Sequence, residues 1–485
     1  METGMLILIV GAVLLGAVAA ATLAGRAGVP VLVVFLGVGM LLGSDGPGGI
    51  DFSDVHLARN VGIVGLAVIL FEGGITTPWR AIRRVAVPAA SLSTVGIVVT
   101  MAITALVARA VFPLSWSASF LLGAVVASTD AAAVFSTLRV TNLRRRLGRV
   151  LEAESGANDP TAVALTIGLI HWVDGSATGI AELAWLVVRQ LALGLVFGLA
   201  IGAAAAWALA RLPDLAVPFA PVATVAAGAI GFGLTDVAGG SGFLAVYIVG
   251  LWIGNAATRL RRTLVNFHAG LAFLSQVGLF IVLGLFSFPH ELKSVILPGL
   301  AVVAVLLFVA RPVGVWLSTT FQGFDLRERT LLGWAGLRGA VPIVLATYPQ
   351  AEGLHVSRTI FNAVFFVVVA SSLIQGPTLE PLARALGLAG GARGSYAPPL
   401  EIAAVDSLGS GLLEFGVAAD SVVAGRHVRE LGLPRDALVA VIVRDGEALP
   451  PRGSTLIAAG DRLYVLSRRE SRRDVERLFD AWRHG

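Results

Sequence analysis

The stretch LEAESGANDPTAVALTIGLI, residues 151–170, places carboxylic acids inside an otherwise apolar run. Glu154 and Asp159 lie within it, and Ser155 and Asn158 stand between them. On a helix, Ser155, Asn158 and Asp159 share one face, which offers oxygen ligands and one amide. Such a ligand set suits protons and hard cations rather than soft metals. Because an ionisable side chain in a membrane costs about 2.5–3.5 kcal/mol, this face indicates an ion or proton path.

A second apolar run, LLGAVVASTDAAAVFSTL, carries the polar pair Thr129 and Asp130 near its centre. Short polar side chains can replace backbone hydrogen bonds where a membrane helix unwinds, so the pair predicts an interrupted helix. A structural alternative stays open, because such residues also join neighbouring helices, and threonine commonly bonds its own helix.

A third run, LLGWAGLRGAVPIVLATY, contains Arg338 followed by a glycine and a proline, which predicts a second interrupted helix. A guanidinium inside a membrane needs an anion, so Arg338 is predicted to balance the charge of Glu154 or Asp159. Two further ionisable residues in apolar runs, Arg311 and Glu72, are predicted to be structural partners or interface residues.

The composition indicates a polytopic membrane protein, since 56% of the 485 residues are hydrophobic and only 14% are charged. The absence of cysteine excludes disulfides, iron–sulfur clusters and thiol nucleophiles. The only lysine, Lys293, lies in a predicted loop, and no phosphate-binding loop is present. We therefore predict no cofactor.

Spans of about 20 residues predict thirteen transmembrane helices. They cover residues 5–24, 28–44, 60–78, 86–109, 116–138, 150–173, 183–210, 216–236, 240–256, 268–287, 294–317, 328–348 and 359–380. Arginines concentrate in every second loop, which places the N-terminus outside and the C-terminus in the cytoplasm. The interrupted spans, the fifth and the twelfth, are typical of an inverted-repeat secondary transporter with a binding site at mid-membrane.

The chain divides into a transmembrane domain, 1–385, a Gly/Pro/Ala linker, 386–399, and a soluble α+β domain, 400–485. In the last domain, alternation of apolar residues predicts strands at 400–405, 437–445 and 461–467, and helices at 425–433 and 468–482. Acidic and basic residues nearly balance there, which argues against nucleic acid as a partner.

Four segments, STDAAAVFSTL, ESGANDPTA, GGSGFLAVYIVGL and GLRGAVPIVLA, together resemble the monovalent cation:proton antiporter-1 family. The resemblance implies a homodimer in which each chain has thirteen helices and a mobile six-helix core with crossed broken helices. It makes Asp159 the carboxylate shared by cation and proton. Asp130, Thr129, Ser155 and Glu154 would surround the ion, and Arg338 would pair with Glu154. Within that family, an Asn-Asp pair such as Asn158-Asp159 marks electroneutral exchange.

Residues 400–478 resemble the TrkA-C type domain of regulators of potassium conductance. The resemblance implies a small regulatory ligand and favours potassium as the transported ion. Dinucleotide binding is not implied, because residues 381–398 lack a strand followed by a Gly-x-Gly-x-x-Gly turn.

The sequence thus predicts an electroneutral potassium/proton antiporter of the bacterial inner membrane, working by alternating access around Asp159. Sodium/proton exchange is the alternative. A ligand-gated cation channel is a weaker one, because no carbonyl selectivity filter is present. An intramembrane aspartyl protease would use Asp130 with Asp159, but the Gly-x-Gly-Asp setting of such enzymes is missing.

Overall fold

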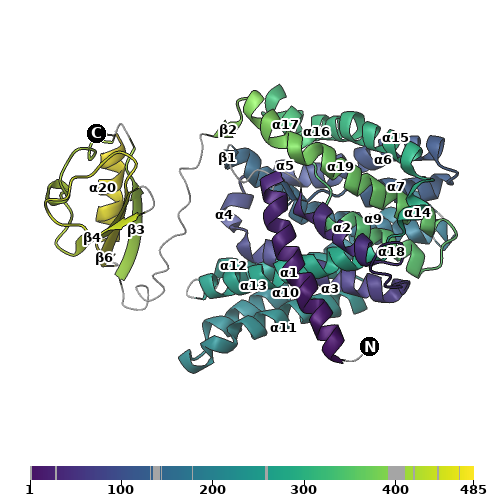
Figure 1. The fold of residues 1–485 in the computed structure, drawn as a ribbon, viewed down its shortest axis with the longest axis horizontal. Coiled ribbons are helices and arrows are strands. Elements are labelled where there is room, and N and C mark those ends of the chain that lie inside the picture. The colour runs from purple at the N-terminus through teal and green to yellow at the C-terminus, as the bar shows by residue number, and fades with distance from the viewer. Residues whose placement is uncertain are drawn as a thin grey trace. The chain divides into compact units, whose positions relative to one another are not determined.

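The computed structural model describes residues 3–27, 30–130, 133–134, 142–143, 145–176, 179–256, 260–390, 410–418, 421–444, 447–468 and 470–484. Contacts within the chain divide it into two units, Met1–Ala392 and Arg393–Gly485. The first unit is helical, and the second contains a small antiparallel sheet (Figure 1).

The first half of the helical unit contains α1 (Thr3–Ala27), α2 (Val31–Leu42), α3 (Val55–Thr76), α4 (Trp79–Ile82), α5 (Ala86–Ser91), the π-helix η1 (Leu92–Gly96), α6 (Ile97–Val111), α7 (Trp116–Ala127) and α9 (Arg145–Val173). It continues with α10 (Ile180–Ala210), the 3-10 helix η2 (Asp214–Phe219), α11 (Ala220–Val237), α12 (Gly242–Ala256) and α13 (Arg261–Leu285). The last helices are α14 (Pro289–Leu292), α15 (Ile296–Val305), the π-helix η3 (Leu306–Ala310), α16 (Arg311–Thr319), α17 (Leu326–Trp334), α18 (Ala340–Ala351) and α19 (Ser357–Ala385). One short antiparallel pair joins β1 (Asn142–Leu143) to β2 (Ala389–Gly390).

Each predicted span overlaps a helix or a succession of helices, and in the span 116–138 the overlap is with α7, because much of the rest lies outside the described residues. Among the described residues, seven helical segments are long and apolar enough to cross a bilayer. They are Val55–Thr76, Ala86–Val111, Ile180–Ala210, Val217–Val237, Arg261–Leu285, Pro289–Thr319 and Ser357–Ala385. Shorter apolar helices include α2, α7 and α12. The protein is therefore a multi-pass membrane protein, and the count of thirteen spans stays a prediction.

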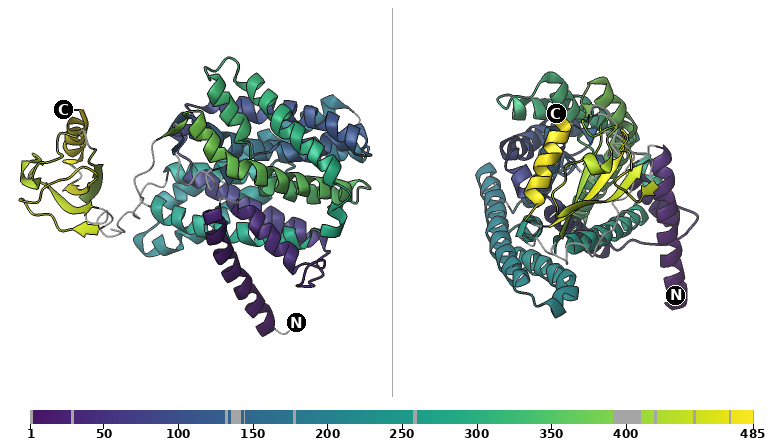
Figure 2. Two further views of the ribbon diagram at one scale, coloured as in Figure 1. Left: turned by 45° about the horizontal axis from the view of Figure 1, so that its top comes forward. Right: turned by 90° about the vertical axis from the view of Figure 1, so that its left-hand side faces the viewer.

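The helices pack in two groups (Figure 2). A scaffold group comprises α2, α3 and α10 to α13, where α3 packs against both α12 and α13. A core group comprises α5, α6, α7, α9 and α15 to α19, where α7 packs against α6 and α9, and α18 against α19. Contacts of α18 with α3 and of α9 with α10 join the two groups.

Both predicted helix interruptions are present, and they meet inside the core group. Helix α7 ends at Ala127, and residues 335–339 separate α17 from α18. The Asp130 N–H donates to the Leu337 carbonyl at 2.8 Å, so the two non-helical segments touch. Pro342 does not cause the second interruption, because it lies in the first turn of α18, where a missing N–H costs no hydrogen bond.

A π-helical turn interrupts the first long helix of each half of the core group. One turn, η1, lies between α5 and α6, and the other, η3, lies between α15 and α16. A broken segment follows each of these helices in the chain, α7 in one half and α17–α18 in the other. The two halves therefore repeat one order of features.

The second unit is a four-stranded antiparallel sheet in the order β3-β6-β4-β5. Its elements are β3 (Ser410–Gly416), the 3-10 helix η5 (Val428–Glu430), β4 (Ala437–Arg444), β5 (Glu447–Leu449), β6 (Arg462–Arg468) and α20 (Arg472–His484). Phe415 of β3 packs against Phe479 and Trp482 of α20, so the helix covers the core of this sheet.

Three of the five predicted elements of this unit are confirmed: the strands at 437–445 and 461–467 and the helix at 468–482. The helix predicted at 425–433 is wrong, because Gly425 and Gly432 adopt positive φ angles of +83° and +67° and only the single turn η5 forms. The strand predicted at 400–405 lies outside the described residues.

Candidate ion-binding site

Helix α9 carries the predicted carboxylates into the interior of the core group. Asp159 lies near the middle of this 29-residue helix with 6% of its surface exposed, and Glu154 and Asn158 are buried as completely. Pro160 has no N–H, so the Gly156 carbonyl receives no hydrogen bond from the next helical turn. Gly156 itself packs against the ring of Tyr247, where a Cβ atom would overlap the phenol.

A hydrogen bond connects α9 to the first interruption. The Asn158 side-chain amide donates to Thr129 Oγ1 at 2.6 Å, and both groups are buried. This bond holds Asp159 beside the segment that contains Asp130, and the two carboxyl groups are close enough to interact electrostatically. Asp130 also accepts a hydrogen bond from the Ala133 N–H at 3.2 Å.

Asp130 lies between the two interruptions. Its backbone bonds to the second interruption, and its carboxylate occupies the space where a side chain at residue 339 would stand. Gly339 is therefore required by close approach, since a Cβ atom there would overlap the carboxylate. The structure thus brings Asp130, Thr129, Asn158 and Asp159 together.

Several buried oxygen atoms at this crossing have no hydrogen-bond partner among the described residues. They are Ser128 Oγ, Asn158 Oδ1 and Asp159 Oδ1. Buried polar atoms normally have partners, and an exception therefore indicates a ligand or a proton. Ser155 is half-buried on the same helix and makes polar contacts of its own. A small oxygen-binding cation fits this donor set, with carboxylate, amide and hydroxyl oxygens as its ligands.

The ion pair of Glu154 differs from the prediction. Arg311 Nη1 lies 2.5 Å from Glu154 Oε1, and both side chains are almost fully buried. The prediction that Arg338 pairs with Glu154 is therefore wrong in its partner, although Arg338 interacts electrostatically with both Arg311 and Glu154. Arg311 begins α16, and its role as a structural partner is confirmed.

Arg338 instead donates hydrogen bonds to carbonyl groups that the broken helices leave unpaired. Its Nε donates to the Val126 carbonyl near the end of α7 at 3.1 Å, and its Nη1 donates to the Gly336 carbonyl. Carbonyls at a helix C-terminus lack intrahelical partners and carry partial negative charge, so a cation is stabilising there. Arg338 thereby fixes the end of one broken helix against the other.

Helix α19 supplies two further polar side chains that the sequence analysis missed. Gln375 donates to the Trp334 carbonyl at 2.7 Å, and Ser372 donates to the Arg338 carbonyl at 3.3 Å. Both side chains are fully buried. The polar residues of SSLIQ, residues 371–375, inside the last apolar span were the available signal.

Comparison with known proteins identifies the family to which this architecture belongs. The family model described as "Sodium/hydrogen exchanger, transmembrane" matches residues 10–385. The chain belongs to the sodium/hydrogen exchanger family. Residues 412–480 match the TrkA-C domain, as the resemblance implied.

Similar proteins of this family include the K(+)/H(+) antiporter NhaP2 of Shewanella sp. (strain MR-4), which is 39% identical over 94% of this chain and 79% of its own length. The K(+)/H(+) antiporter NhaP of Alkalimonas amylolytica is 36% identical over 95% of this chain and 80% of its own. The solved structure of the sodium proton antiporter MjNhaP1 from Methanocaldococcus jannaschii has a TM-score of 0.69 at 24% identity, covering 80% of this chain and 99% of that one.

A polar cavity of about 380 Å³ follows the second half of α9 in this exchanger family member. Its lining begins at Val163, about one helical turn beyond Asp159, and reaches Asp174 at the end of the helix. The ion pair between Arg59 of α3 and Glu352, which follows α18, lies in the cavity wall at 3.4 Å. The cavity therefore lies between the scaffold and core groups, and its lining on α9 ends about one turn from Asp159.

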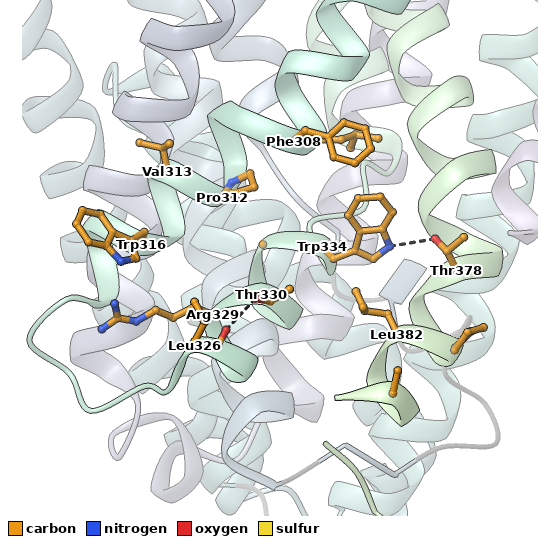
Figure 3. Close-up of a pocket in the computed structure, with 14 residues that line it drawn as sticks. Phe308, Pro312, Val313, Trp316, Leu326, Arg329, Thr330, Trp334, Thr378 and Leu382 are labelled. Carbon is orange, nitrogen blue, oxygen red and sulfur yellow. Dashed lines mark hydrogen bonds between the residues drawn. The ribbon is translucent and has the colours of Figure 1, made fainter. Parts of the chain in front are cut away.

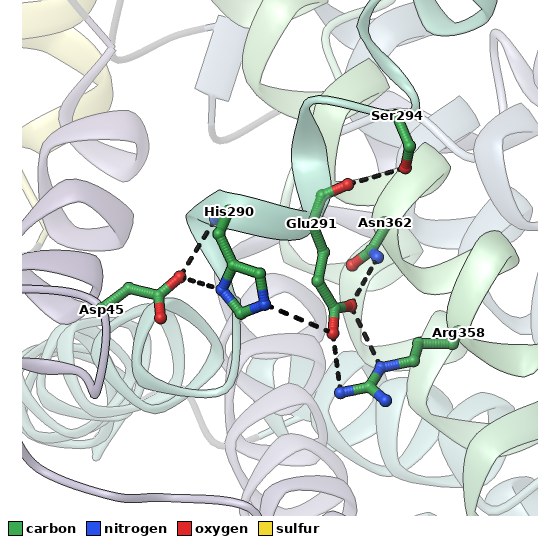
Figure 4. Close-up of polar contacts among 6 residues, drawn as sticks. All are labelled: Asp45, His290, Glu291, Ser294, Arg358 and Asn362. Atoms are coloured by element: carbon green, nitrogen blue, oxygen red, sulfur yellow. Dashed lines mark hydrogen bonds and ion pairs between the residues drawn. The ribbon is translucent and has the colours of Figure 1, made fainter.

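A second polar cluster joins the two groups near the start of α19 (Figure 4). Glu291 of α14 accepts hydrogen bonds from Arg358 Nε at 3.0 Å and from Asn362 Nδ2 at 2.9 Å. Next to it, His290 bonds to Asp45 in the loop after α2 through both its backbone N–H and its ring. These bonds hold the pKa of Asp45 below its usual range. The cluster thus ties a scaffold loop to a core helix.

Proposed function

We propose that the protein exchanges potassium for protons, one for one, around the Asp159 carboxylate. The observation that carries this proposal concerns Asp159 Oδ1, which has no hydrogen-bond partner among the described residues and is buried where two broken helices cross. A carboxylate in such a place is costly unless it holds a proton or a cation. Because it binds one or the other, a site exposed to each side in turn couples the two fluxes.

In this proposal each site residue has a separate role. Asp159 is the shared carboxylate, and Asp130, Thr129 and Ser155 supply further oxygens to the cation. Asn158 positions Asp159 through its bond to Thr129.

Two residues beside this cluster balance charge. Glu154 lies beside the site, and the Arg311 guanidinium neutralises the charge of its carboxylate. Arg338 adds positive charge nearby and holds the crossing together.

Potassium is favoured over sodium by two observations. The relatives that match along most of the chain are named as K(+)/H(+) antiporters. The chain also ends in a TrkA-C domain, which we propose binds a small regulatory ligand. Sodium is the alternative substrate, since the similar fold of MjNhaP1 belongs to a sodium proton antiporter.

The proposal extends to the assembly. We propose thirteen spans with inverted repeats, a homodimer in the bacterial inner membrane with lipid around it, an outer N-terminus and a cytoplasmic C-terminus. The transport domain would be residues 1–385, joined by the linker 386–399 to the regulatory domain, 400–485. The repeated order of a π turn followed by a broken segment supports the two-fold repeat.

The decisive experiment replaces Asp159 by Asn and measures cation-driven proton flux in liposomes. Exchange should vanish for potassium, sodium, lithium and rubidium alike, because an amide cannot exchange a proton at the site. Glu152→Gln is the matched control, since Glu152 is an exposed carboxylate on the same helix. Flux that survives in the Asp159 variant would remove the shared-carboxylate mechanism. Potassium flux independent of any proton movement in the native protein would indicate a channel instead.

One-for-one exchange can be tested separately with a clamped membrane potential. A potential of 100 mV supplies about 2.3 kcal/mol for each net charge moved. Because only Asp159 is proposed to change its proton, the cation gradient at flux balance should be equal at 0 mV and 100 mV. A balance point that shifts with the potential would show that a second group, such as Asp130, also carries a proton.

A further inference from the structure

A large apolar groove lies on the core group, away from the ion site (Figure 3). Its volume is about 820 Å³, within the range of about 300–1,000 Å³ that small-molecule sites occupy. Helices α16, α17 and α19 form its walls together with η3. We name it the α16–α19 groove, and the residues that matter below are Phe308, Trp316, Leu326, Arg329, Trp334 and Leu382.

Most polar groups in this groove are already satisfied. Thr330 Oγ1 donates to the Leu326 carbonyl at 2.8 Å, and Thr378 Oγ1 donates to the Ile374 carbonyl at 2.6 Å. The Trp334 indole donates to Thr378 at 3.0 Å, as Figure 3 shows. The groove therefore presents an apolar wall with one exception.

The exception is Arg329. Its Nη2 donates to the carbonyls of Thr319 and Thr320 at 3.1 and 3.3 Å, which fixes the guanidinium near the end of α16. Among the residues that the structure describes, no acid forms an ion pair with it, and its Nε has no acceptor. The nearest acids in sequence, Asp325 and Glu328, are engaged with each other's backbone in a capping box.

Positive charge gathers at this end of the groove. Arg327 is exposed in the first turn of α17, and Arg146 donates to the carbonyls of Gln322 and Gly323 in the loop between α16 and α17. Trp316 lies about one turn before the end of α16 and is half exposed, as tryptophans at a membrane surface commonly are. The groove is thus amphipathic, with a basic end at a loop and an apolar remainder.

We propose that the α16–α19 groove binds a phospholipid whose headgroup carries a net negative charge. The acyl chain would lie along Phe308, Trp334 and Leu382, and the phosphate would meet the guanidinium of Arg329. Charge complementarity selects this occupant, because a zwitterionic headgroup places its own cation beside the phosphate and offsets the attraction to Arg329, while a headgroup of net negative charge does not. An apolar groove that includes the exposed Phe308 and Trp316 and has a basic end at a loop matches the shape of such a lipid.

An occupant of this groove would touch the elements that hold the ion site. Pro312 in the groove wall directly follows Arg311, which pairs with Glu154. Gly333 and Trp334 end α17, immediately before the second interruption. A bound lipid would therefore pack against the half-helix α17 and stabilise it, and we expect this to raise the exchange rate.

The experiment is native mass spectrometry of the full-length protein titrated with phosphatidylglycerol or with phosphatidylcholine of identical acyl chains. We expect phosphatidylglycerol to bind more tightly by about fivefold, the factor for one basic residue near an anionic surface at about 1 kcal/mol. Arg329→Gln should remove the preference, and Arg329→Lys should restore part of it. Arg327→Gln, in the same helix but outside the groove, should keep it. A groove-filling Leu382→Trp variant, which leaves the bonds of Arg329 intact, should bind neither lipid at this site.

Five outcomes would overturn the proposal. Equal binding of the two lipids would remove the role of charge, and equal loss in the Arg327 and Arg329 variants would reduce it to general surface attraction. Unchanged binding in Leu382→Trp would place the lipid elsewhere.

Since the chain has no cysteine, a single Leu382→Cys substitution reports on a second copy, and its disulfide-linked dimerisation in membranes would replace lipid with protein as the occupant. Competition by inorganic phosphate alone would identify a free anion site, which also contradicts a lipid.

Discussion

The buried pair of Arg311 and Glu154 gives the sharpest test of how the core group is held together. Two unit charges 2.5 Å apart attract by about 7 kcal/mol at an effective dielectric constant of 20, and desolvation of both ions offsets much of this. Removing one partner, however, leaves the other charge buried and alone. Arg311→Met should therefore lower the free energy of unfolding by about 3–5 kcal/mol.

Replacing both partners should recover most of that loss. In Glu154→Gln/Arg311→Met no uncompensated charge remains, and apolar packing takes the place of the pair. The assay is thermal unfolding of the detergent-solubilised single and double variants, analysed as a double-mutant cycle. We expect strong coupling between residues 154 and 311. The matched cycle, Glu154→Gln with Arg338→Met, should show weaker coupling, because Arg338 bonds to carbonyl groups.

Two results would refute this reasoning. If Arg311→Met unfolds at the same temperature as the native protein, Glu154 has another partner within reach, and Arg338, which interacts electrostatically with Glu154, is the candidate. If the cycle with Arg338 shows the larger coupling, the pairing expected from the sequence is correct and the structural assignment is not.

Three further predictions concern other parts of the chain. Burial raises the pKa of Asp461. Two hydrogen bonds from Arg444 at 2.8 Å and one from a backbone N–H outweigh this effect and hold the pKa below its usual range. A pKa lowered by folding contributes stability above the unfolded value and loses it as pH falls. The protection of backbone amides within 410–484 of the full chain, relative to their intrinsic exchange rate at each pH, should therefore fall below about pH 4, and Asp461→Asn should remove most of that dependence. Gly339→Ala should reduce exchange by displacing Asp130, visible as lost flux in a protein that still purifies folded; full activity would contradict the close approach. Deleting 398–485 should leave liposome exchange intact but change its regulation, and complete inactivity at every pH would show that the two parts are not separable.

The sequence predicted which segments form this site better than it predicted which side chains pair within it. The interruptions at Asp130 and Arg338 were predictable because polar residues, glycine and arginine in apolar runs are costly unless a helix opens around them. The partner of Glu154 was not predictable in the same way. Arg311 and Arg338 are both intramembrane arginines, and only the packing of α16 against α17 decides which one reaches α9.

Local exceptions were harder still. A proline four residues after Arg338 signalled a break, but its actual place is the first helical turn after the break. In the C-terminal unit, the apolar spacing around His427 suggested a helix. Pairing of His427 with Leu456 and two glycines with positive φ prevail there, because tertiary contacts override weak helical periodicity.

The crossing of the broken helices also has a consequence for membrane insertion. At 1.5 Å per residue, α7 is about 18 Å long and α17 about 14 Å, whereas the hydrocarbon core is about 30 Å thick. Neither half-helix can enter the bilayer as an independent span. The carbonyls of Trp334 and Arg338 find their partners in Gln375 and Ser372, which are synthesised 41 and 34 residues later. The second broken segment is therefore stable in the bilayer only after α19 has been synthesised, so biogenesis must keep it shielded until the last helix arrives.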